Sequence, residues 1–162
     1  MKTFEINTKQ YINKPLDVVF QFFSKPENLE MITPESLSFN ILTPISIRME
    51  TGSLIDYTIR LFGIPIHWRT LISDYEPPFR FVDQQIKGPY TFWHHTHTFQ
   101  SVDGGVEIID KVKYSLPMGW LGTLAHSIWV RKDLEKIFKH RKTVIQNYFE
   151  IINISTERMI ES

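Results

Sequence analysis

Beyond Gly122 the chain contains neither glycine nor proline, and its apolar side chains recur at the spacing of a helix. Lysine and glutamate residues occupy the positions between them. This pattern predicts one long amphipathic helix over about residues 125–152. The side chains expected on its apolar face are Leu134, Ile137, Phe138, Ile145 and Tyr148. An apolar stripe of this length must be buried, so the rest of the chain has to supply a broad apolar surface.

The other face of the predicted helix is rich in basic residues. They are Arg131, Lys132, Lys136, Lys139, Arg141 and Lys142. Because acidic residues are interleaved with them, we expect this face to be exposed to solvent, with ion pairs between successive turns. The helix follows a cluster of proline and glycine residues, 116–122, which interrupts the strand pattern before it.

The middle of the chain has the opposite character, because short apolar stretches alternate with turn residues. Glycine and proline mark these turns, for example at Gly63, Pro77-Pro78 and Gly88-Pro89. The strands predicted between them cover residues 37–43, 53–61, 65–74, 79–87, 91–101 and 105–115. Connections this short join antiparallel neighbours, because parallel strands would need long crossovers.

The N-terminal part adds a strand over residues 3–12 and two short helices. The first helix is expected to begin near Pro15, and the second to begin near Pro26 and to end before Pro34. The predicted class is α+β. In the predicted architecture, a curved antiparallel sheet of about six or seven strands wraps around the long C-terminal helix.

Composition limits the possible functions. The 162 residues suggest one domain over residues 1–155, with a frayed tail at 156–162. Eighteen basic and 18 acidic residues give zero net charge, which argues against nucleic-acid binding. The chain has no cysteine, and no stretch is apolar enough for a signal peptide or a membrane helix. We therefore expect a cytoplasmic protein without stable membrane insertion, as a monomer or weak homodimer.

Aromatic residues make up 14% of the chain, more than an ordinary core requires, which suggests a lined cavity. Side chains alternate between the two faces of a strand, so the apolar members of each strand identify its inner face. With a contribution from the helix, this alternation gives the candidate ligand-binding residues Tyr57, Trp68, Asp83, Gln85, Trp93, His95, His97, Asp110, Tyr114 and Ile137. We expect an enclosed cavity of roughly a few hundred Å³.

Polar residues on this inner face form two possible histidine–aspartate couples. A two-residue turn between the last two strands would place His97 opposite Asp110. A three-residue turn between the preceding pair would place His95 opposite Asp83. The first register stays open, because Gly104-Gly105 could form the turn or carry a bulge.

Three interpretations of these couples are possible. The two histidines could bind a metal with Asp110 or Asp83, although no cysteine or further histidine joins the motif, so we expect neither a metal nor another cofactor. His95, His97, Asp110 and Asp83 are also the candidate catalytic residues, because a carboxylate can orient an imidazole for acid–base chemistry. In the simplest interpretation, they form a hydrogen-bonded cavity floor that recognises the polar end of a ligand.

Several segments resemble a known superfamily. They are Pro15–Phe23, Pro26–Leu29 with Thr33-Pro34, Tyr75–Phe81, Gly88–Tyr90, Trp93–Phe99 and Leu116–Gly119. With the order of elements, they resemble the SRPBCC helix-grip superfamily, which includes START lipid-transfer domains, the major birch pollen allergen and polyketide cyclase/dehydrase-like proteins. The similarity is greatest to small bacterial members of the cyclase/dehydrase-like group.

The resemblance implies an internal apolar cavity beneath the long helix, and it brings no single catalytic motif. The function that it favours is binding of a small hydrophobic or amphipathic molecule. One alternative is a cyclase or dehydratase that acts on a polyketide-like or aromatic substrate. A second alternative is a protein-interaction module whose cavity is vestigial, because one fold hosts many functions.

Overall fold

The computed structural model describes residues 2–44 and 48–160, with the backbone alone at 120, 122, 126, 127 and 153–160. Its N-terminal elements are β1 (Phe4–Ile12), α1 (Leu16–Phe23), α2 (Asn28–Ile32) and the short 3₁₀ helix η1 (Glu35–Leu37). The strands that follow are β2 (Asn40–Ile41), β3 (Leu54–Leu61), β4 (Ile64–Glu76), β5 (Arg80–Lys87), β6 (Phe92–Val102) and β7 (Gly105–Ser115). The C-terminal helices are α3 (Gly119–Ala125), the π-helical η2 (His126–Val130) and α4 (Arg131–Ile160).

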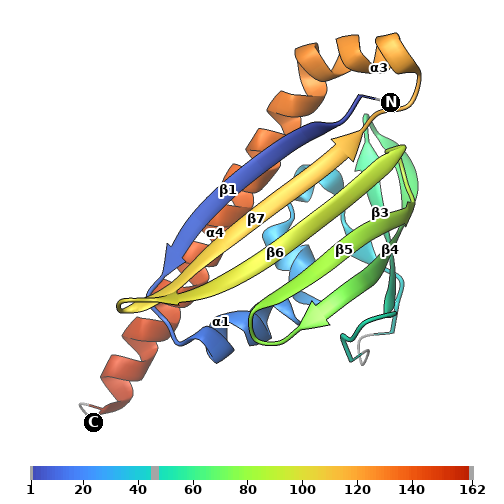
Figure 1. The fold of residues 1–162 in the computed structure, drawn as a ribbon. Helices are drawn as coiled ribbons and strands as arrows, with labels where there is room; N and C mark the ends of the chain where they lie inside the picture. The colour runs from blue at the N-terminus through green and yellow to red at the C-terminus, as the bar shows by residue number, and fades with distance from the viewer. Residues whose placement is uncertain (1, 45–47, 161–162) are drawn as a thin grey trace.

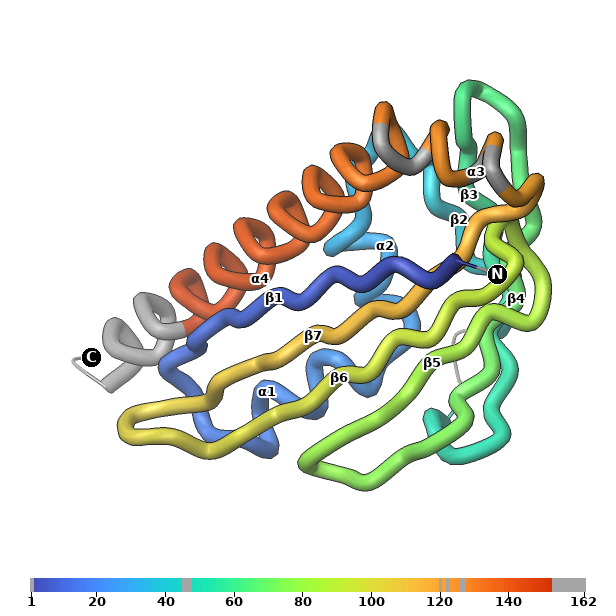
Figure 2. The backbone as a smooth tube through the Cα atoms, turned by 45° about the horizontal axis from the view of Figure 1, so that its top comes forward, coloured from blue at the N-terminus to red at the C-terminus, as the bar shows by residue number. Residues whose placement is uncertain are grey.

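All seven strands form one antiparallel sheet in the order β1-β7-β6-β5-β4-β3-β2. Helix α4 runs along one face of this sheet, and α1 and α2 lie on the same side (Figures 1 and 2). The predicted α+β helix-grip architecture is thus confirmed. Among the described residues, no helix is both long enough and apolar enough to cross a membrane.

The apolar stripe of α4 packs as its spacing predicts. Leu134, Phe138 and Ile145 are buried, and the partly buried Ile137 and Tyr148 pack against the same clusters. The helix is longer than expected, because its backbone continues to Ile160. Fraying of the last residues stays a prediction, since 161 and 162 lie outside the described part of the chain.

Two segments differ from the prediction. The strand expected over 37–43 shrinks to β2, because Ser38 has a left-handed φ of 44° and the N–H groups of Leu42 and Thr43 both donate to the carbonyl of Asp56. Helical structure also begins earlier than the predicted residue 125, because the cluster 116–122 contains the start of α3. Proline precedes this helix instead of interrupting it, so the N–H groups inside the helix are retained.

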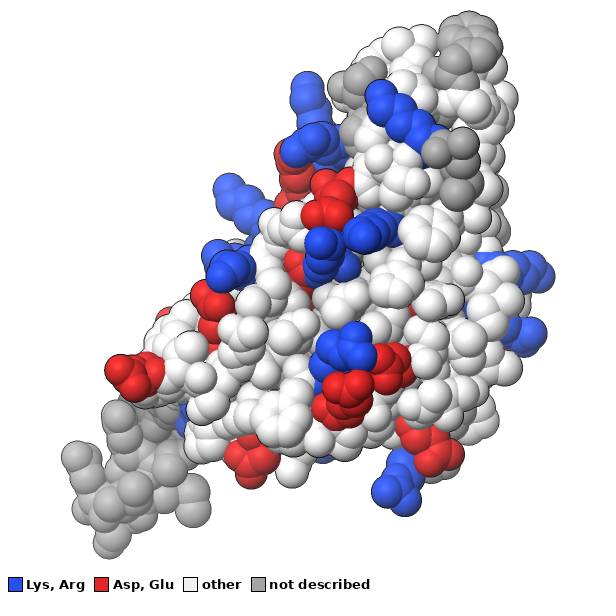
Figure 3. All heavy atoms as spheres, in the orientation of Figure 1, with Lys and Arg blue, Asp and Glu red and all other residues white. Residues whose placement is uncertain are grey.

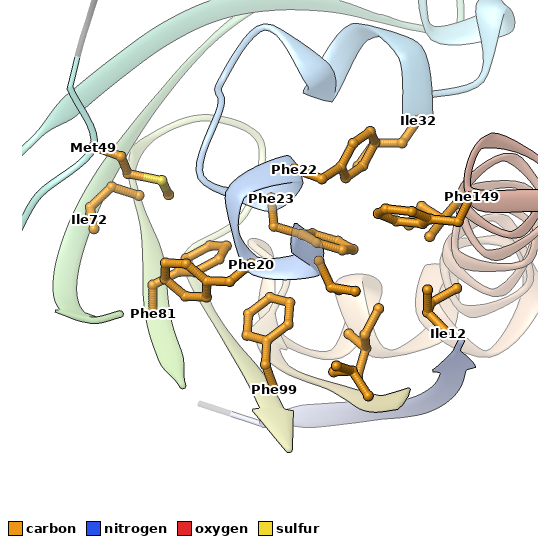
Figure 4. Close-up of a cluster of buried hydrophobic side chains, with 14 of the residues drawn as sticks. Ile12, Phe20, Phe22, Phe23, Ile32, Met49, Ile72, Phe81, Phe99 and Phe149 are labelled. Atoms are coloured by element: carbon orange, nitrogen blue, oxygen red, sulfur yellow. The ribbon is translucent and has the colours of Figure 1, made fainter. Parts of the chain in front are cut away.

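The core consists of two apolar clusters on the concave face of the sheet. The first brings phenylalanines from α1, β5, β6 and α4 together, with Phe20 and Phe99 ring centroids 5.2 Å apart (Figure 4). The second is built around Trp68, Trp93 and Tyr114, which Leu134 and Phe138 of α4 cover. The candidate site lies between the two clusters.

Both predicted hairpin registers are confirmed. Asp103-Gly104 forms a two-residue turn, in which Gly104 has a φ of 78°, and His97 lies opposite Asp110. In the neighbouring pair of strands, Asp83 lies opposite His95. Turn chemistry therefore brings both aspartates beside the two histidines on the inner face of the sheet.

Candidate functional site

Two histidines of the central strand β6 meet a carboxylate from each neighbouring strand. His95 and His97 are two residues apart and so point to the same face, where they are only 4% and 3% exposed. Asp83 on β5 and Asp110 on β7 flank them, with side chains 19% and 11% exposed. Charged groups this deeply buried require close partners.

Each carboxylate bridges both imidazoles. His97 Nε2 donates to Asp83 Oδ2 over 2.7 Å, and His95 Nε2 donates to Asp110 Oδ1 over 2.9 Å. The other two ring nitrogens, Nδ1 of His95 and of His97, lie 3.4 Å from Asp83 Oδ2 and 2.9 Å from Asp110 Oδ1. The strand register suggests two separate couples, but the hydrogen bonds cross between them. This is possible because the rings lie close together, with centroids 3.7 Å apart and planes tilted by 35°.

Arg141 on α4 is a fifth member of the network. The prediction that Arg141 lies on a solvent-exposed basic face is therefore wrong. Its side chain is 11% exposed, and Nη2 lies 3.6 Å from Asp110 Oδ1 and 3.3 Å from His97 Nδ1. Its guanidinium also lies over the rings of Phe23 and Phe138, at 5.3 and 6.0 Å from their centroids. The spacing could have revealed it, because Arg141 follows Phe138 by three residues on the apolar stripe.

The buried carboxylates remain charged because cationic groups surround them. Burial opposes the charge on Asp110, but the Arg141 charge and the hydrogen bonds from both histidines hold the pKa of this carboxyl well below its usual range. Burial likewise opposes the charge on Asp83, and the attraction of His95 and the hydrogen bond from His97 lower its pKa. The network therefore provides two anions.

The pKa values of the two histidines shift in opposite directions. Burial disfavours the charge on His97, but its interactions with Asp110 and Asp83 outweigh this cost and raise its pKa. Burial and the neighbouring charge of His97 lower the pKa of His95. With His97 protonated and His95 neutral, the charges of the two aspartates, Arg141 and His97 cancel.

This arrangement predicts split histidine titrations. By NMR, His97 should titrate above the ordinary value of about 6.5 and His95 below it. Stabilisation by His97 is then present at low pH and is lost as pH rises through its folded pKa. The neutral form of His95 contributes stability above about pH 6.5, and this contribution is lost as pH falls through the folded pKa of His95. Two titrations at the free-imidazole value, unchanged by Asp83→Asn, would contradict the network.

The network forms part of the wall of a cavity of about 190 Å³ between the sheet, α4 and the short helices. The cavity is smaller than expected and is not fully enclosed, and the exposed Lys25 stands at its rim. Its volume is limited because aromatic rings fill the space. Tyr57 stacks on Trp68 at 5.8 Å, and Trp93 meets the same indole edge-on at 5.4 Å.

Most of the predicted ligand-binding residues lie in the cavity wall. They are Tyr57, Trp68, Asp83, Trp93, His95, His97 and Ile137. Three predicted residues are not part of the lining. Gln85 pairs through its amide with the backbone of Tyr90, Tyr114 is fully buried, and the carboxylate of Asp110 contacts both histidines. The alternation rule identifies the inner face of a strand, but it does not say which inner residues border empty space.

Helices α1 and α2 supply lining residues that strand alternation could not identify. Phe22 and Phe23 come from α1, and Leu29 comes from α2. The broad apolar face of α1 was the available signal, because a short helix with this many buried aromatics must cover part of the core.

Within the described part of the chain, one group of side chains has the donors for a metal ion. Asp83, His95 and His97 each offer a ligand atom, all within 4.8 Å of one another. However, all four ring nitrogens lie within 3.4 Å of a carboxylate oxygen. An ion bound to His95 and His97 would have to replace some of these contacts. The arrangement therefore suits hydrogen bonding.

No protein-family model matches the sequence, and no curated protein matches it. Solved structures do match. The protein CV1439 from Chromobacterium violaceum is 13% identical, with a TM-score of 0.70 over 90% of this chain and 97% of that one. The major latex-like protein 151 from Panax ginseng is 11% identical, with a TM-score of 0.67 over 91% and 97% of the two chains. Ara h 8.0201 is 12% identical, with a TM-score of 0.65 over 91% and 98%.

At these identities the likeness concerns architecture alone. It extends over nearly the full length of each matched chain, and it includes the curved sheet and the long C-terminal helix. The chain therefore has the helix-grip fold of these solved structures.

Proposed function

We propose that this protein binds a small, largely apolar molecule in the cavity beneath α4. The observation that carries this proposal is a cavity wall that is mostly aromatic and aliphatic, with one polar region formed by Asp83, His95, His97 and Arg141. Apolar burial would supply most of the affinity, and the few polar groups would fix the orientation of the ligand. The fold supports the proposal, because the superfamily that the sequence resembles includes lipid-transfer domains.

The hydrogen bonds of the network favour binding over acid–base catalysis. A general base needs a nitrogen free to take a proton from the substrate. Both ring nitrogens of His95 and both of His97 lie within 3.4 Å of a carboxylate oxygen. In a cyclase or dehydratase the unprotonated nitrogen of His95 would have to turn from Asp83 toward the substrate, whereas a binding site can use the network as it stands.

Titration with the neutral dye N-phenyl-1-naphthylamine tests the proposal, because its emission rises in apolar surroundings. We expect a saturable rise in emission with one dye molecule bound per chain. Displacement of the dye by small hydrocarbons would show that the site accepts apolar molecules generally. An absence of saturable binding would overturn the proposal and favour an interaction module with a vestigial cavity.

A further inference from the structure

Asp83 is the most exposed member of the buried network, and it belongs to the cavity wall. Its side chain is 19% exposed, compared with 11% or less for Asp110, Arg141 and the two histidines. It lies opposite His95 on the inner face of the sheet, where the cavity is. A molecule in the cavity can therefore reach this carboxylate.

The network uses only one oxygen of the Asp83 carboxylate. Oδ2 lies 2.7 Å from His97 Nε2 and 3.4 Å from His95 Nδ1. No donor among the described residues is paired with the other oxygen, Oδ1, yet Oδ1 is not one of the fully buried atoms that lack a partner. Oδ1 is therefore accessible, and it offers an acceptor in a mainly apolar wall.

Only a hydrogen-bond donor can pair with this oxygen. The pKa of Asp83 is lowered, so the group is an ionised carboxylate, which accepts and does not donate. Aromatic rings stand beside it. Burial raises the pKa of Tyr57, and the charge on nearby Asp83 adds to this rise, while Trp68 stacks on Tyr57 at 5.8 Å. A ring packed against these side chains can carry its donor group to Asp83.

The charges of the network favour a neutral donor. Two anions, Asp83 and Asp110, already face two cations, Arg141 and the protonated His97. A cationic ligand would add a buried charge that has no counterion, which is costly in an apolar cavity. A hydroxyl group can donate to the carboxylate without adding charge.

We propose that Asp83 selects ligands that carry a neutral hydroxyl group on a compact ring, as phenols and cyclic alcohols do. The hydroxyl donates to Oδ1 of Asp83, and the apolar ring lies beside Tyr57 and Trp68. This inference rests on the proposed function, since it names the class of molecule that occupies the same cavity.

Two probes of nearly equal size test the inference in the wild-type protein. The first is 4-tert-butylphenol, and the second is 4-tert-butyltoluene, in which a methyl group replaces the hydroxyl. Their affinities are measured by displacement of N-phenyl-1-naphthylamine. Burial of an unpaired hydroxyl is unfavourable, so a cavity without an accessible acceptor favours the hydrocarbon by more than about tenfold. We expect the phenol to bind at least as tightly as the hydrocarbon.

The variant Asp83→Asn tests whether this residue causes the preference. The N–H group of His97 requires the amide oxygen as its acceptor, so a ligand hydroxyl loses its anionic partner. We expect the affinity ratio of phenol to hydrocarbon to fall about tenfold, as for the loss of one hydrogen bond to a charged group. Asp56→Asn is the matched control, because Asp56 also pairs with a histidine and an arginine, His67 and Arg69, but does not line the cavity. Its ratio should stay that of the wild type.

A third probe, 4-tert-butylbenzylamine, tests the preference for a neutral donor, because it is a cation at neutral pH. We expect it to bind at least about tenfold more weakly than the phenol, since its charge has no counterion in the cavity. Tighter binding of the amine than of the phenol would overturn the assignment of a hydroxyl.

The outcomes separate this inference from the proposed function. If the dye binds but the hydrocarbon outcompetes the phenol by more than about tenfold, the inference is wrong and the proposed function stands. The same conclusion follows if Asp83→Asn keeps the wild-type ratio. If the dye does not bind, the proposed function fails, and the inference fails with it. Binding of the hydrocarbon to Asp83→Asn verifies that its cavity has formed, and the wild-type comparison decides if this variant does not fold.

Discussion

Replacing Asp110 with alanine is expected to destabilise the fold by about 3 kcal/mol, because it breaks a buried network of charges. Asp110 Oδ1 lies 2.9 Å from a ring nitrogen of each histidine and 3.6 Å from Arg141 Nη2. Without the carboxylate, the buried guanidinium of Arg141 loses the anion beside it, and the N–H group of His95 has no acceptor. Urea denaturation of the two proteins measures the difference in unfolding free energy.

Glu107→Ala is the matched control, since Glu107 lies on the same strand and forms an exposed ion pair with Lys9 at 3.1 Å. We expect a loss of less than about 1 kcal/mol there. Asp110→Asn should fall between the two, because the amide keeps an acceptor oxygen but loses the charge. An Asp110→Ala variant as stable as the Glu107→Ala variant would refute the role assigned to the network.

Replacing Ile137 with tryptophan is expected to weaken binding of N-phenyl-1-naphthylamine at least about tenfold. Ile137 is partly buried on α4 and lines the cavity. A larger side chain at this position would occupy space that the dye needs, and the cavity measures only about 190 Å³. Fluorescence titration gives the dissociation constants.

Lys139→Trp places the same side chain at an exposed position of the same helix and should leave dye binding unchanged. Thermal unfolding of both variants shows whether α4 still packs on the sheet. Equal dye affinity in the Ile137→Trp variant and the wild type would mean that the dye binds elsewhere.

Local patterns in the sequence were sufficient to predict the sheet and the pairing of its strands. The turn residues Asp103-Gly104 determine the β6–β7 register, and alternation along β6 then puts His95 and His97 on the inner face. The helical spacing of Leu134, Phe138 and Ile145 likewise predicts the buried face of α4. Each of these features depends on short-range geometry, which sequence patterns record directly.

The details of the site depend on packing across elements, which local patterns do not record. Arg141 was assigned to solvent because its neighbours are basic, yet the cavity side of α4 buries it. The hydrogen bonds cross between the couples because the closely spaced rings of His95 and His97 have both carboxylates within reach. The size of the cavity depends on how closely Tyr57 and Trp68 stack, which alternation along a strand cannot predict.

Native mass spectrometry of the protein equilibrated with N-phenyl-1-naphthylamine tests most directly whether the cavity is a binding site. We predict a saturable complex with one dye molecule per chain, formed by the wild type and the Lys139→Trp variant and lost from the Ile137→Trp variant. A spectrum that contains only the free protein would contradict ligand binding in the cavity. So would adducts that never saturate and that persist in the Ile137→Trp variant.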